Sequence, residues 1–386
     1  MHPATTPTET DTSEPVFGPT EAEIDASLGA LRGQRVAIAL SGGVDSAVAA
    51  RRLREAGAEP IGLSLRLHDP DPGNPLAPRA CCPPDDLQDA RRIAEMLGFP
   101  FYLIDGRAEF TDHVVRPFVR SYLSGRTPNP CVGCNGFVKL ERLHRRARAL
   151  GCVALATGHY ARSMNGRLFA GLDPRKDQSY FLFSAGSDVL ADLVFPLGAW
   201  TKEQVRDEAI RSGLPVADKL ESQEVCFVGG AGAGGFVMRQ PEAQGDHEGE
   251  IVDESGRVLG QHAGVMNFTV GQRKGIGVSA ARPLHVLRIL PESKRVVVGP
   301  KDRLAASGLR AERVQWLRAP DGPVRARVQI RYRDPGMDAT VTPSGTGHGA
   351  EVRFDRPVRA VAPGQAAVFR SADEVLGGGW IQEALP

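Results

Sequence analysis

The sequence lacks two features that would place it in or across a membrane. No apolar run among the 386 residues approaches the ~20 needed to span a bilayer. Residues 1–33 are rich in threonine, proline and acidic residues, without the basic and apolar segments of a secretory signal. We therefore expect residues 1–33 to form a mobile tail and the protein to be cytoplasmic.

A strong net charge is also lacking. The formal charge is only +1, so the overall field does not indicate a nucleic-acid partner. Local clusters can still bind phosphates on a neutral protein, although each can equally be a solvated surface. The arginine clusters are Arg51, Arg52 and Arg54; Arg142, Arg145, Arg146 and Arg148; and Arg325, Arg327, Arg331 and Arg333.

Cysteine is scarce, with six residues: Cys81, Cys82, Cys131, Cys134, Cys152 and Cys226. In a chain of this length without a secretory signal, they favour metal-binding or catalytic roles over a disulfide framework. Cys152 lies in an apolar run and is interpreted as a buried structural residue. The adjacent Cys81 and Cys82 are interpreted as an exposed or structural pair.

Two common phosphate-binding motifs are missing, but a third glycine-rich loop is present. No Gly-Lys-Ser/Thr or G-x-G-x-x-G pattern follows the first apolar run. The segment Ser41-Gly-Gly-Val-Asp-Ser46 instead lies between the apolar run 36–40 and the helix-compatible run 47–55. A strand, turn and helix in this order direct backbone N–H groups toward one point, which suits a phosphate.

Residues 34–213 alternate short apolar runs with helical periods, which predicts a doubly wound parallel sheet covered by helices on both faces. The expected strands are 36–40, 61–67, 101–104 and 152–156, and the expected helices are 85–97, 109–123 with a kink at Pro117, and 137–150. Ligands bind beyond the carboxyl ends of such strands, where the loop after Leu40 and the loop 157–160 are expected.

The remaining chain has a different character. Residues 214–304 are expected to form a small, mostly β central domain, with a flexible glycine-rich loop at 229–235. Residues 305–386 show no helical period and are expected to form a β-barrel. Alternation at 324–332 predicts a half-buried strand with a basic outer face.

The Ser41–Ser46 loop resembles the SGGxDS loop of the pyrophosphate-loop ATPases. Five later stretches occur with it in order: 127–135 (TPNPCVGCN), 156–162 (ATGHYAR), 176–182 (KDQSYFL), 221–227 (ESQEVCF) and 268–275 (FTVGQRKG). Together they resemble the bacterial tRNA-specific 2-thiouridylase (MnmA) family from about residue 35 to 382.

The resemblance implies ATP-dependent thiolation of the wobble uridine at its C2 position, in the tRNAs for Lys, Glu and Gln. ATP would adenylate the C2 oxygen, sulfur would replace it, and AMP and pyrophosphate would be released, with Mg²⁺ bridging the phosphates. The residues implied to hold ATP are Ala39, Leu40, Ser41, Gly42, Gly43, Val44, Asp45, Ser46, Leu65 and Gly158.

The resemblance also implies a sulfur route through Cys226 and Cys134. Cys226 would carry a persulfide supplied by a cysteine desulfurase or a sulfur relay protein, and Cys134 would attack it or close a disulfide after transfer. Cys131 departs from a version of the motif that has aspartate there. Cys131, Cys134 and Cys226 could alternatively hold a [4Fe–4S] cluster that carries sulfide.

The tRNA contacts implied by the resemblance are Asn129, Pro130, Cys131, His159, Lys176, Asp177, Gln178, Arg331, Tyr332 and Gln365. The target base would be turned out of its stack to be reached. Tyr332 falls on the inward face of its predicted strand, unless the alternation ends before it. Two other hypotheses remain: a different pyrophosphate-loop ligase without paired cysteines, and a non-catalytic RNA-binding protein with an iron–sulfur redox sensor.

Overall fold

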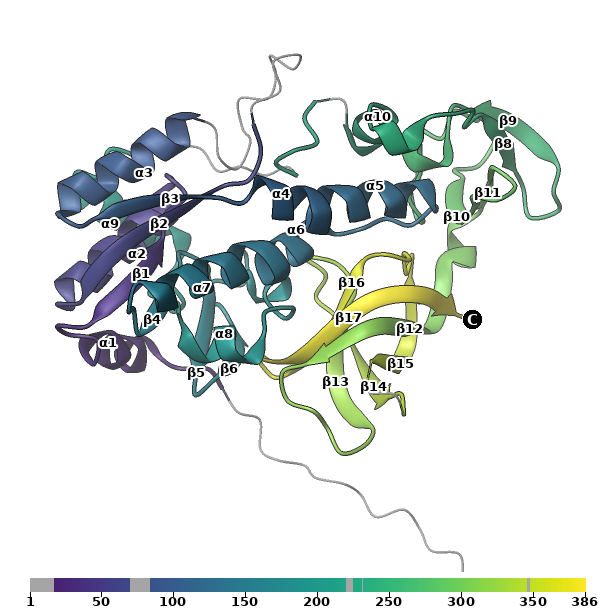
Figure 1. Cartoon of the computed structure of the whole chain (residues 1–386). Helices are drawn as coiled ribbons and strands as arrows, with labels where there is room; N and C mark the ends of the chain where they lie inside the picture. The colour runs from purple at the N-terminus through teal and green to yellow at the C-terminus, as the bar shows by residue number, and fades with distance from the viewer. Residues whose placement is uncertain (1–16, 70–83, 220–224, 231, 346–347) are drawn as a thin grey trace, which may run out of the picture.

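The computed structural model describes residues 17–69, 84–219, 225–230, 232–345 and 348–386. They form a parallel sheet flanked by helices, a four-stranded sheet and a closed barrel (Figure 1). The predicted α/β class, with a central β domain and a C-terminal barrel, is confirmed. No helix in these ranges is long and apolar enough to cross a bilayer.

The parallel sheet has the strand order β3-β2-β1-β4-β7. Its strands are β1 (Arg35–Ala39), β2 (Glu59–Arg66), β3 (Phe101–Asp105), β4 (Ala154–Ala156) and β7 (Leu193–Val194). Every pairing between them is parallel. The chain reverses its direction of travel across the sheet at β1, so the ligand-binding edge is expected where β1 and β4 end.

Both faces of this sheet are buried because side chains of β1 alternate between two cores. Val36 and Ile38 pack in one core, and Ala37 and Ala39 pack in or against the other. The first core is covered by α1 (Glu21–Gly29), α2 (Val44–Glu55), α3 (Pro84–Leu97) and α9 (Lys202–Arg211).

Helix α1 corrects the predicted tail. Its Ile24 and Leu28 are buried in the first core, and Thr20 caps its first turn. The capping box at Thr20 and Glu23 is a helix-start signal that the composition of residues 1–33 obscured. The described segment from residue 17 onward therefore belongs to the folded domain, and residues 1–16 lie outside the described residues.

Two interrupted helices cover the second face. One runs through α4 (Arg107–Phe110), a π-helical turn (Thr111–Val115) and α5 (Arg116–Leu123). The predicted kink at Pro117 therefore takes the form of a wide turn just before the proline, which has no N–H to donate. The other runs through α6 (Pro130–Gly133), a π-helical stretch (Cys134–Leu140) and α7 (Glu141–Ala149).

The central domain contains the four-stranded sheet, in the order β10-β11-β8-β9. Its elements are α10 (Gly232–Met238), β8 (Gly249–Val252), β9 (Val258–His262), β10 (His285–Leu290) and β11 (Arg295–Gly299). Helix α10 corrects the predicted flexible loop at 229–235, because Val237 anchors the helix against Phe118 and Val119 of α5. The long α4–α5 rod thereby joins the parallel-sheet domain to the central domain (Figure 1).

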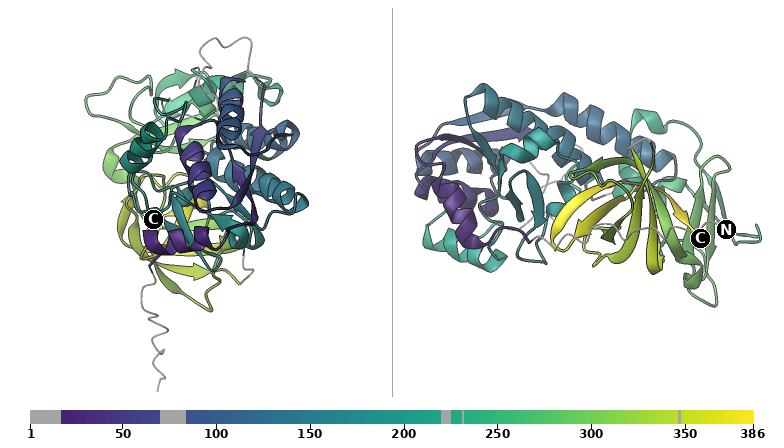
Figure 2. Two further views of the ribbon diagram at one scale, coloured as in Figure 1. Left: turned by 90° about the vertical axis from the view of Figure 1, so that its left-hand side faces the viewer. Right: turned by 90° about the horizontal axis from the view of Figure 1, so that it is seen from below.

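The barrel closes where β12 pairs with both β15 and β17. Its strands are β12 (Ala305–Trp316), β13 (Val324–Gln329), β14 (Met337–Pro343), β15 (Gly349–Arg359), β16 (Ala366–Ser371) and β17 (Glu374–Leu385). A hairpin from the first domain, β5 (Ala161–Met164) and β6 (Arg167–Ala170), extends the barrel sheet by pairing with β17. Figure 2 shows the barrel between the other two parts.

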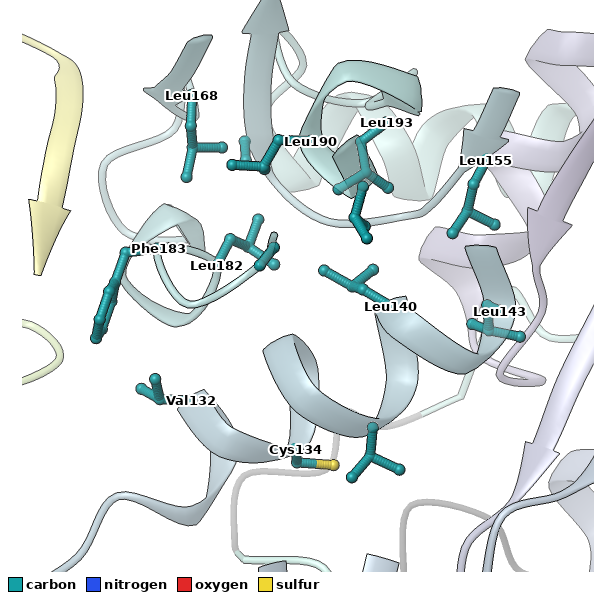
Figure 3. Packing of buried hydrophobic residues seen from close by; sticks show 14 of the residues in the cluster. Val132, Cys134, Leu140, Leu143, Leu155, Leu168, Leu182, Phe183, Leu190 and Leu193 are labelled. Atoms are coloured by element: carbon teal, nitrogen blue, oxygen red, sulfur yellow. The ribbon is translucent and has the colours of Figure 1, made fainter. Parts of the chain in front are cut away.

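One hydrophobic core spans the first domain and the barrel. It contains Cys134 and Leu155 from the first domain together with Val368 and Trp380 from the barrel. Figure 3 shows part of this core, with Val132 and Cys134 on one helix and Leu182 and Phe183 facing it. The α8 helix (Ser187–Asp192) contributes Leu190 to the same core.

Polar contacts lock the same boundary. The Asp177 carboxylate accepts from the Arg370 guanidinium of β16 at 3.0 Å, and both side chains are largely buried. The Thr127 N–H donates to the Pro363 carbonyl at 2.8 Å, and the Gln365 side chain donates to the Thr127 carbonyl at 2.9 Å. The segment that leads into α6 is therefore fixed by the barrel.

Replacing Arg370 with methionine is expected to lower the free energy of unfolding by about 3 kcal/mol, because Asp177 would keep a buried charge without its cation. Urea denaturation measures the change. The matched control is Arg353→Met, whose exposed guanidinium pairs with Glu351 and whose loss should cost under about 0.5 kcal/mol. Equal effects of the two substitutions would contradict the buried-pair argument.

Candidate active site

The loop between β1 and α2 is fixed by its own serines and glycines. Gly42 has a φ of 74°, and a Cβ at this position would lie 2.0 Å from the Asp86 carbonyl oxygen. The Ser46 hydroxyl donates to the Gly43 carbonyl at 3.0 Å and accepts from the Ser41 N–H at 3.2 Å. The loop therefore holds a compact shape at the N-terminus of the 12-residue helix α2.

This loop borders a cavity of about 360 Å³, a size typical of small-molecule sites. All residues predicted to hold ATP line the cavity except Gly42, whose role is the close backbone approach. The lining residues from that prediction are Ala39, Leu40, Ser41, Gly43, Val44, Asp45, Ser46, Leu65 and Gly158. Their assignment to ATP stays a prediction, but the fold brings them together.

Another part of the cavity wall comes from the loop after β4. Gly158 lies so close to α2 that a Cβ would stand 2.8 Å from the Asp45 carbonyl carbon and the Ser46 nitrogen. Both neighbours are backbone atoms and cannot rotate away. Thr157 and His159 line the cavity beside Gly158. The carboxyl ends of β1 and β4 thus form the site edge that the sheet order predicts.

Asp45 is held by two residues that the sequence analysis missed. Its Oδ1 accepts from the Lys202 ammonium at 2.6 Å and from the Tyr160 hydroxyl at 2.8 Å. The Lys202 side chain is only 8% exposed and Asp45 is 31% exposed, so the lysine end of this ion pair is buried. The pair fixes Asp45 and balances its charge beside the phosphate loop.

Lys219 forms a second lysine contact with the loop. Its ammonium donates to the Gly42 carbonyl at 2.9 Å and pairs with Asp86 and Asp89, both at 2.6 Å. Burial raises the pKa of Asp86, and the lysine opposes that change. Lys219 stands two residues before the 221–227 stretch, so widening that motif would have found it.

His159 and Lys139 meet at the same cavity. Burial and, secondarily, the positive charge of Lys139 lower the pKa of His159 to about 4, so the imidazole is neutral at pH 7. Its Nδ1 lies 3.0 Å from the Thr157 hydroxyl oxygen. His159 is therefore a hydrogen-bonding group here and not a cation.

The residues fit ATP and Mg²⁺ in their chemistry. The α2 N-terminus and the Ser41 and Ser46 hydroxyls suit phosphate oxygens. The carboxylates of Asp45 and Asp86 line the cavity, and Mg²⁺ at phosphate sites commonly uses one or two protein carboxylates.

The two candidate sulfur-carrying cysteines contact one core. Cys134 is buried within the core shared with the barrel, and the half-buried Cys226 packs against it. Figure 3 shows Cys134 on the helix that continues to Leu140 and Leu143, two residues that line the cavity. The helix carrying Cys134 is therefore also a wall of the phosphate-loop cavity.

The three-cysteine metal site is not assembled in this structure. Among the described residues, no group of three or more His, Cys, Asp or Glu side chains is placed to hold a metal ion. Cys131, Cys134 and Cys226 all belong to those residues, so their present arrangement does not fit a [4Fe–4S] cluster. Cys81 and Cys82 lie outside the described residues.

Cys152 has the structural surroundings expected for it. The residue is 3% exposed and belongs to the shared core. Burial raises the pKa of its thiol, which disfavours the reactive thiolate.

Several of the residues predicted to contact tRNA form hydrogen bonds or ion pairs within the protein. Asn129 caps α6 by accepting from the Cys131 N–H at 3.2 Å, and Pro130 is the first residue of that helix. The Asp177 carboxylate accepts from the N–H groups of Gly171 and Ser179, besides pairing with Arg370. Asp177 and Gln365 therefore connect the first domain to the barrel.

The other predicted contacts lie at the cavity or the barrel rim. Gln178 lines the cavity and exchanges hydrogen bonds with the backbone of Tyr160, while Lys176 is half-buried two residues earlier. Arg331 donates to the Ala360 carbonyl. Tyr332 lies in a turn beyond β13 and packs 4.5 Å from Phe181, measured between ring centroids. The alternation thus ends before Tyr332.

The predicted half-buried strand with arginines on its outer face is present as β13, and ion pairs balance the charges of two of these arginines. Arg325 binds the Asp355 carboxylate through two nitrogens, at 2.9 and 2.7 Å. Arg327 binds Asp338 in the same bidentate manner, at 3.0 and 3.1 Å. These acids lie on β15 and β14, so only the strand register reveals that both arginine charges are balanced.

The phosphate loop, the doubly wound sheet and the cavity at its edge define a pyrophosphate-loop nucleotide-binding domain with two accessory β domains. Three family profiles match in the same order. They are "tRNA methyl transferase HUP domain" over residues 34–230, "tRNA methyl transferase PRC-barrel domain" over 240–300 and "Aminomethyltransferase beta-barrel domain" over 306–381.

Curated relatives match nearly the whole chain. The tRNA-specific 2-thiouridylase MnmA of Geobacter metallireducens is 48% identical over 91% of this chain and 98% of its own length. The protein of the same name from Sorangium cellulosum is 49% identical over 92% of this chain and 93% of its own length. The chain belongs to the MnmA family of tRNA-specific 2-thiouridylases, as its motifs predicted.

Replacing Gly158 with alanine is expected to weaken ATP binding at least tenfold, because the added methyl group would push the backbone at Asp45 and Ser46 out of position. Isothermal titration calorimetry with ATP and Mg²⁺ measures the affinity. Gly29→Ala is the matched control, since a Cβ there meets nothing within 4 Å. Unchanged affinity in Gly158→Ala would contradict the assignment of Gly158 to the wall of the ATP site.

Replacing Lys202 with methionine is expected to weaken ATP binding about tenfold, because the Asp45 charge would then repel the phosphates. Asp45→Asn in the same chain should recover part of that loss, since it removes the unbalanced charge. Calorimetry with ATP in the absence of Mg²⁺, so that a metal-binding role of Asp45 does not enter, checks both effects on the single and double variants. A double variant no better than Lys202→Met would show that the lysine acts without Asp45.

Proposed function

We propose that this chain thiolates the wobble uridine of the tRNAs for Lys, Glu and Gln at C2, consuming ATP. Relatives named as tRNA-specific 2-thiouridylases align over nine-tenths of the chain and support tRNA modification by a sulfurtransferase. The observation that carries the proposal is one helix with two roles. The helix carries Cys134, and its residues Lys139, Leu140 and Leu143 line the phosphate-loop cavity.

The phosphate loop carries the activation step. The uridine C2 oxygen is a poor leaving group, so it first attacks the α-phosphorus of ATP and expels pyrophosphate. The Ser41–Ser46 loop and the α2 N-terminus bind and orient the phosphates through backbone N–H and hydroxyl groups. The Asp45 or Asp86 carboxylate would hold Mg²⁺, which would neutralise charge on the leaving pyrophosphate.

The cysteines carry the sulfur step. A cysteine desulfurase or relay protein leaves a persulfide on Cys226, whose terminal sulfur forms the new bond to C2 while the C2–O bond to AMP breaks. The Cys134 thiolate attacks the inner sulfur and closes a Cys134–Cys226 disulfide, either after transfer or while releasing hydrosulfide that then attacks C2. In either order the sulfur atoms of Cys134 and Cys226 must meet, and the two residues contact the same hydrophobic core.

The RNA is recognised by its shape and by the flipped base. Asn129, Pro130 and Cys131 lie at the start of the helix that reaches the cavity, a position suited to an extruded uridine. His159 and Gln178 line the cavity, and Lys176 precedes Gln178 by two residues. We infer a cytoplasmic location, where tRNA and the sulfur donor are found.

Incubation with ATP, Mg²⁺, a persulfide-loaded donor protein and unmodified tRNA-Lys should yield 2-thiouridine and AMP in equal amounts, measured by mass spectrometry of nucleosides and by chromatography. Cys226→Ser and Cys134→Ser should each lower thiolation at least 100-fold, because neither variant can complete sulfur transfer. Cys152→Ala should stay within about threefold of the wild type, since that thiol is buried packing.

The outcomes separate the competing functions. Full activity of Cys226→Ser would indicate a pyrophosphate-loop ligase that does not use sulfur. Binding of tRNA with no ATP consumption would indicate a non-catalytic RNA-binding protein. The third outcome concerns iron. If the wild type binds iron stoichiometrically after anaerobic reconstitution and Cys131→Ala does not, an iron–sulfur cluster would carry the sulfur.

A further inference from the structure

The helix that carries Cys134 brings a second chemical group to the cavity, namely the ammonium of Lys139. Lys139 falls just outside the 127–135 stretch, and nothing in that motif draws attention to it. Its side chain is half-buried, and its charge reaches His159 strongly enough to lower the pKa of that ring. It is therefore part of the cavity wall and not a surface lysine.

The π-helical form of residues Cys134–Leu140 determines where Lys139 faces. In an α-helix, residues five apart differ by about 140° around the axis, at 3.6 residues per turn. A π-helix joins residues five apart by hydrogen bonds, which brings Cys134 and Lys139 toward the same side. Wide turns of this kind occur frequently at functional sites.

The position of Lys139 indicates which part of ATP it meets. A phosphate group suits the Ser41–Ser46 loop and the α2 N-terminus. Lys139 and His159 line the same cavity from other elements, and Lys139 shares its helix with Cys134. Because the uridine must meet both the α-phosphorus and the transferred sulfur, a lysine that lines the cavity on the cysteine helix suits the α-phosphate.

The other two lysines of this region have different positions. Lys202 binds the Asp45 carboxylate, and Lys219 binds Asp86, Asp89 and the Gly42 carbonyl. Both therefore stabilise the phosphate loop itself. Lys139 lines the same cavity from a separate element, the helix that carries Cys134.

We propose that Lys139 is a catalytic residue that binds the α-phosphate of ATP and then the adenylate on the uridine, an inference that rests on the proposed function. In the first step the C2 oxygen bonds to the α-phosphorus and pyrophosphate leaves. In the second step sulfur bonds to C2 and AMP leaves with the electron pair of the C2–O bond. Lys139 stabilises the negative charge that develops on the phosphate oxygens in both steps.

The test compares Lys139→Met, which keeps the length of the side chain, with Lys139→Arg, which keeps its charge. Lys294→Met is the control, because Lys294 forms an exposed pair with Asp246 in the central domain. Single-turnover AMP formation at saturating ATP should fall about 100-fold in Lys139→Met, the usual cost of removing one charge-stabilising donor. Lys139→Arg should recover at least tenfold of that loss.

Three further readouts separate catalysis from structure and from the proposed function. The pKa of His159, followed by NMR, should rise in Lys139→Met, because a positive neighbour has been removed. Persulfide loading of Cys226 by the donor protein should be unchanged. Binding of an α,β-methylene ATP analogue, measured by calorimetry, should be unchanged or weaker and does not depend on thiolation.

The rate of AMP formation and the affinity for the ATP analogue together decide whether Lys139 is catalytic. Slow AMP formation, with or without weaker analogue binding, supports it. Weaker binding with a normal rate at saturating ATP would overturn the catalytic role, because the lysine would then bind ground and transition states equally. Wild-type binding and wild-type rate would also overturn it. If the wild type makes no 2-thiouridine, the proposed function fails and the catalytic role of Lys139 fails with it, whereas a thiolating wild type beside an equally fast Lys139→Met variant rejects the lysine alone.

Discussion

The structure depends on one hydrophobic core that two domains share. Leu155 of the parallel sheet and Val368 and Trp380 of the barrel are buried in the same cluster as Cys134. The antiparallel pairing of β6 with β17 extends one hydrogen-bonded sheet across the boundary between the two domains. The barrel is therefore not an RNA-binding module on a flexible linker, because separating it would expose the core around the cysteine helix. A tRNA that contacts the barrel contacts the active-site framework.

The phosphate loop has a comparable support on its other side. Lys202 reaches Asp45 from α9, and Lys219 reaches the Gly42 carbonyl from the segment that precedes Cys226. The loop shape is thus set by residues 157 and 177 positions away in the sequence. The loop therefore keeps its shape only when distant parts of the domain are folded around it.

The sequence was sufficient where function depends on short, local patterns. The strand, glycine-rich turn and helix at residues 35–55 follow from periodicity and turn chemistry alone. The start of α6 was missed, although Asn129-Pro130 is an N-cap followed by a first-turn proline. Lys202 could not be assigned, because its contact with Asp45 joins segments 157 positions apart, whereas Lys139 and Lys219 each stand within four residues of a recognised motif. The outward arginines of β13 looked unopposed until the register placed Asp338 opposite Arg327.

The bidentate pairs on the barrel also affect how tRNA binding should respond to salt. An arginine that already holds a carboxylate does not displace a condensed cation from RNA unless it first gives up its partner. Arg325 and Arg327 are in that state. The number of phosphates neutralised by this protein is therefore smaller than its arginine clusters suggest. The contribution of these two arginines to tRNA binding should therefore change little with ionic strength.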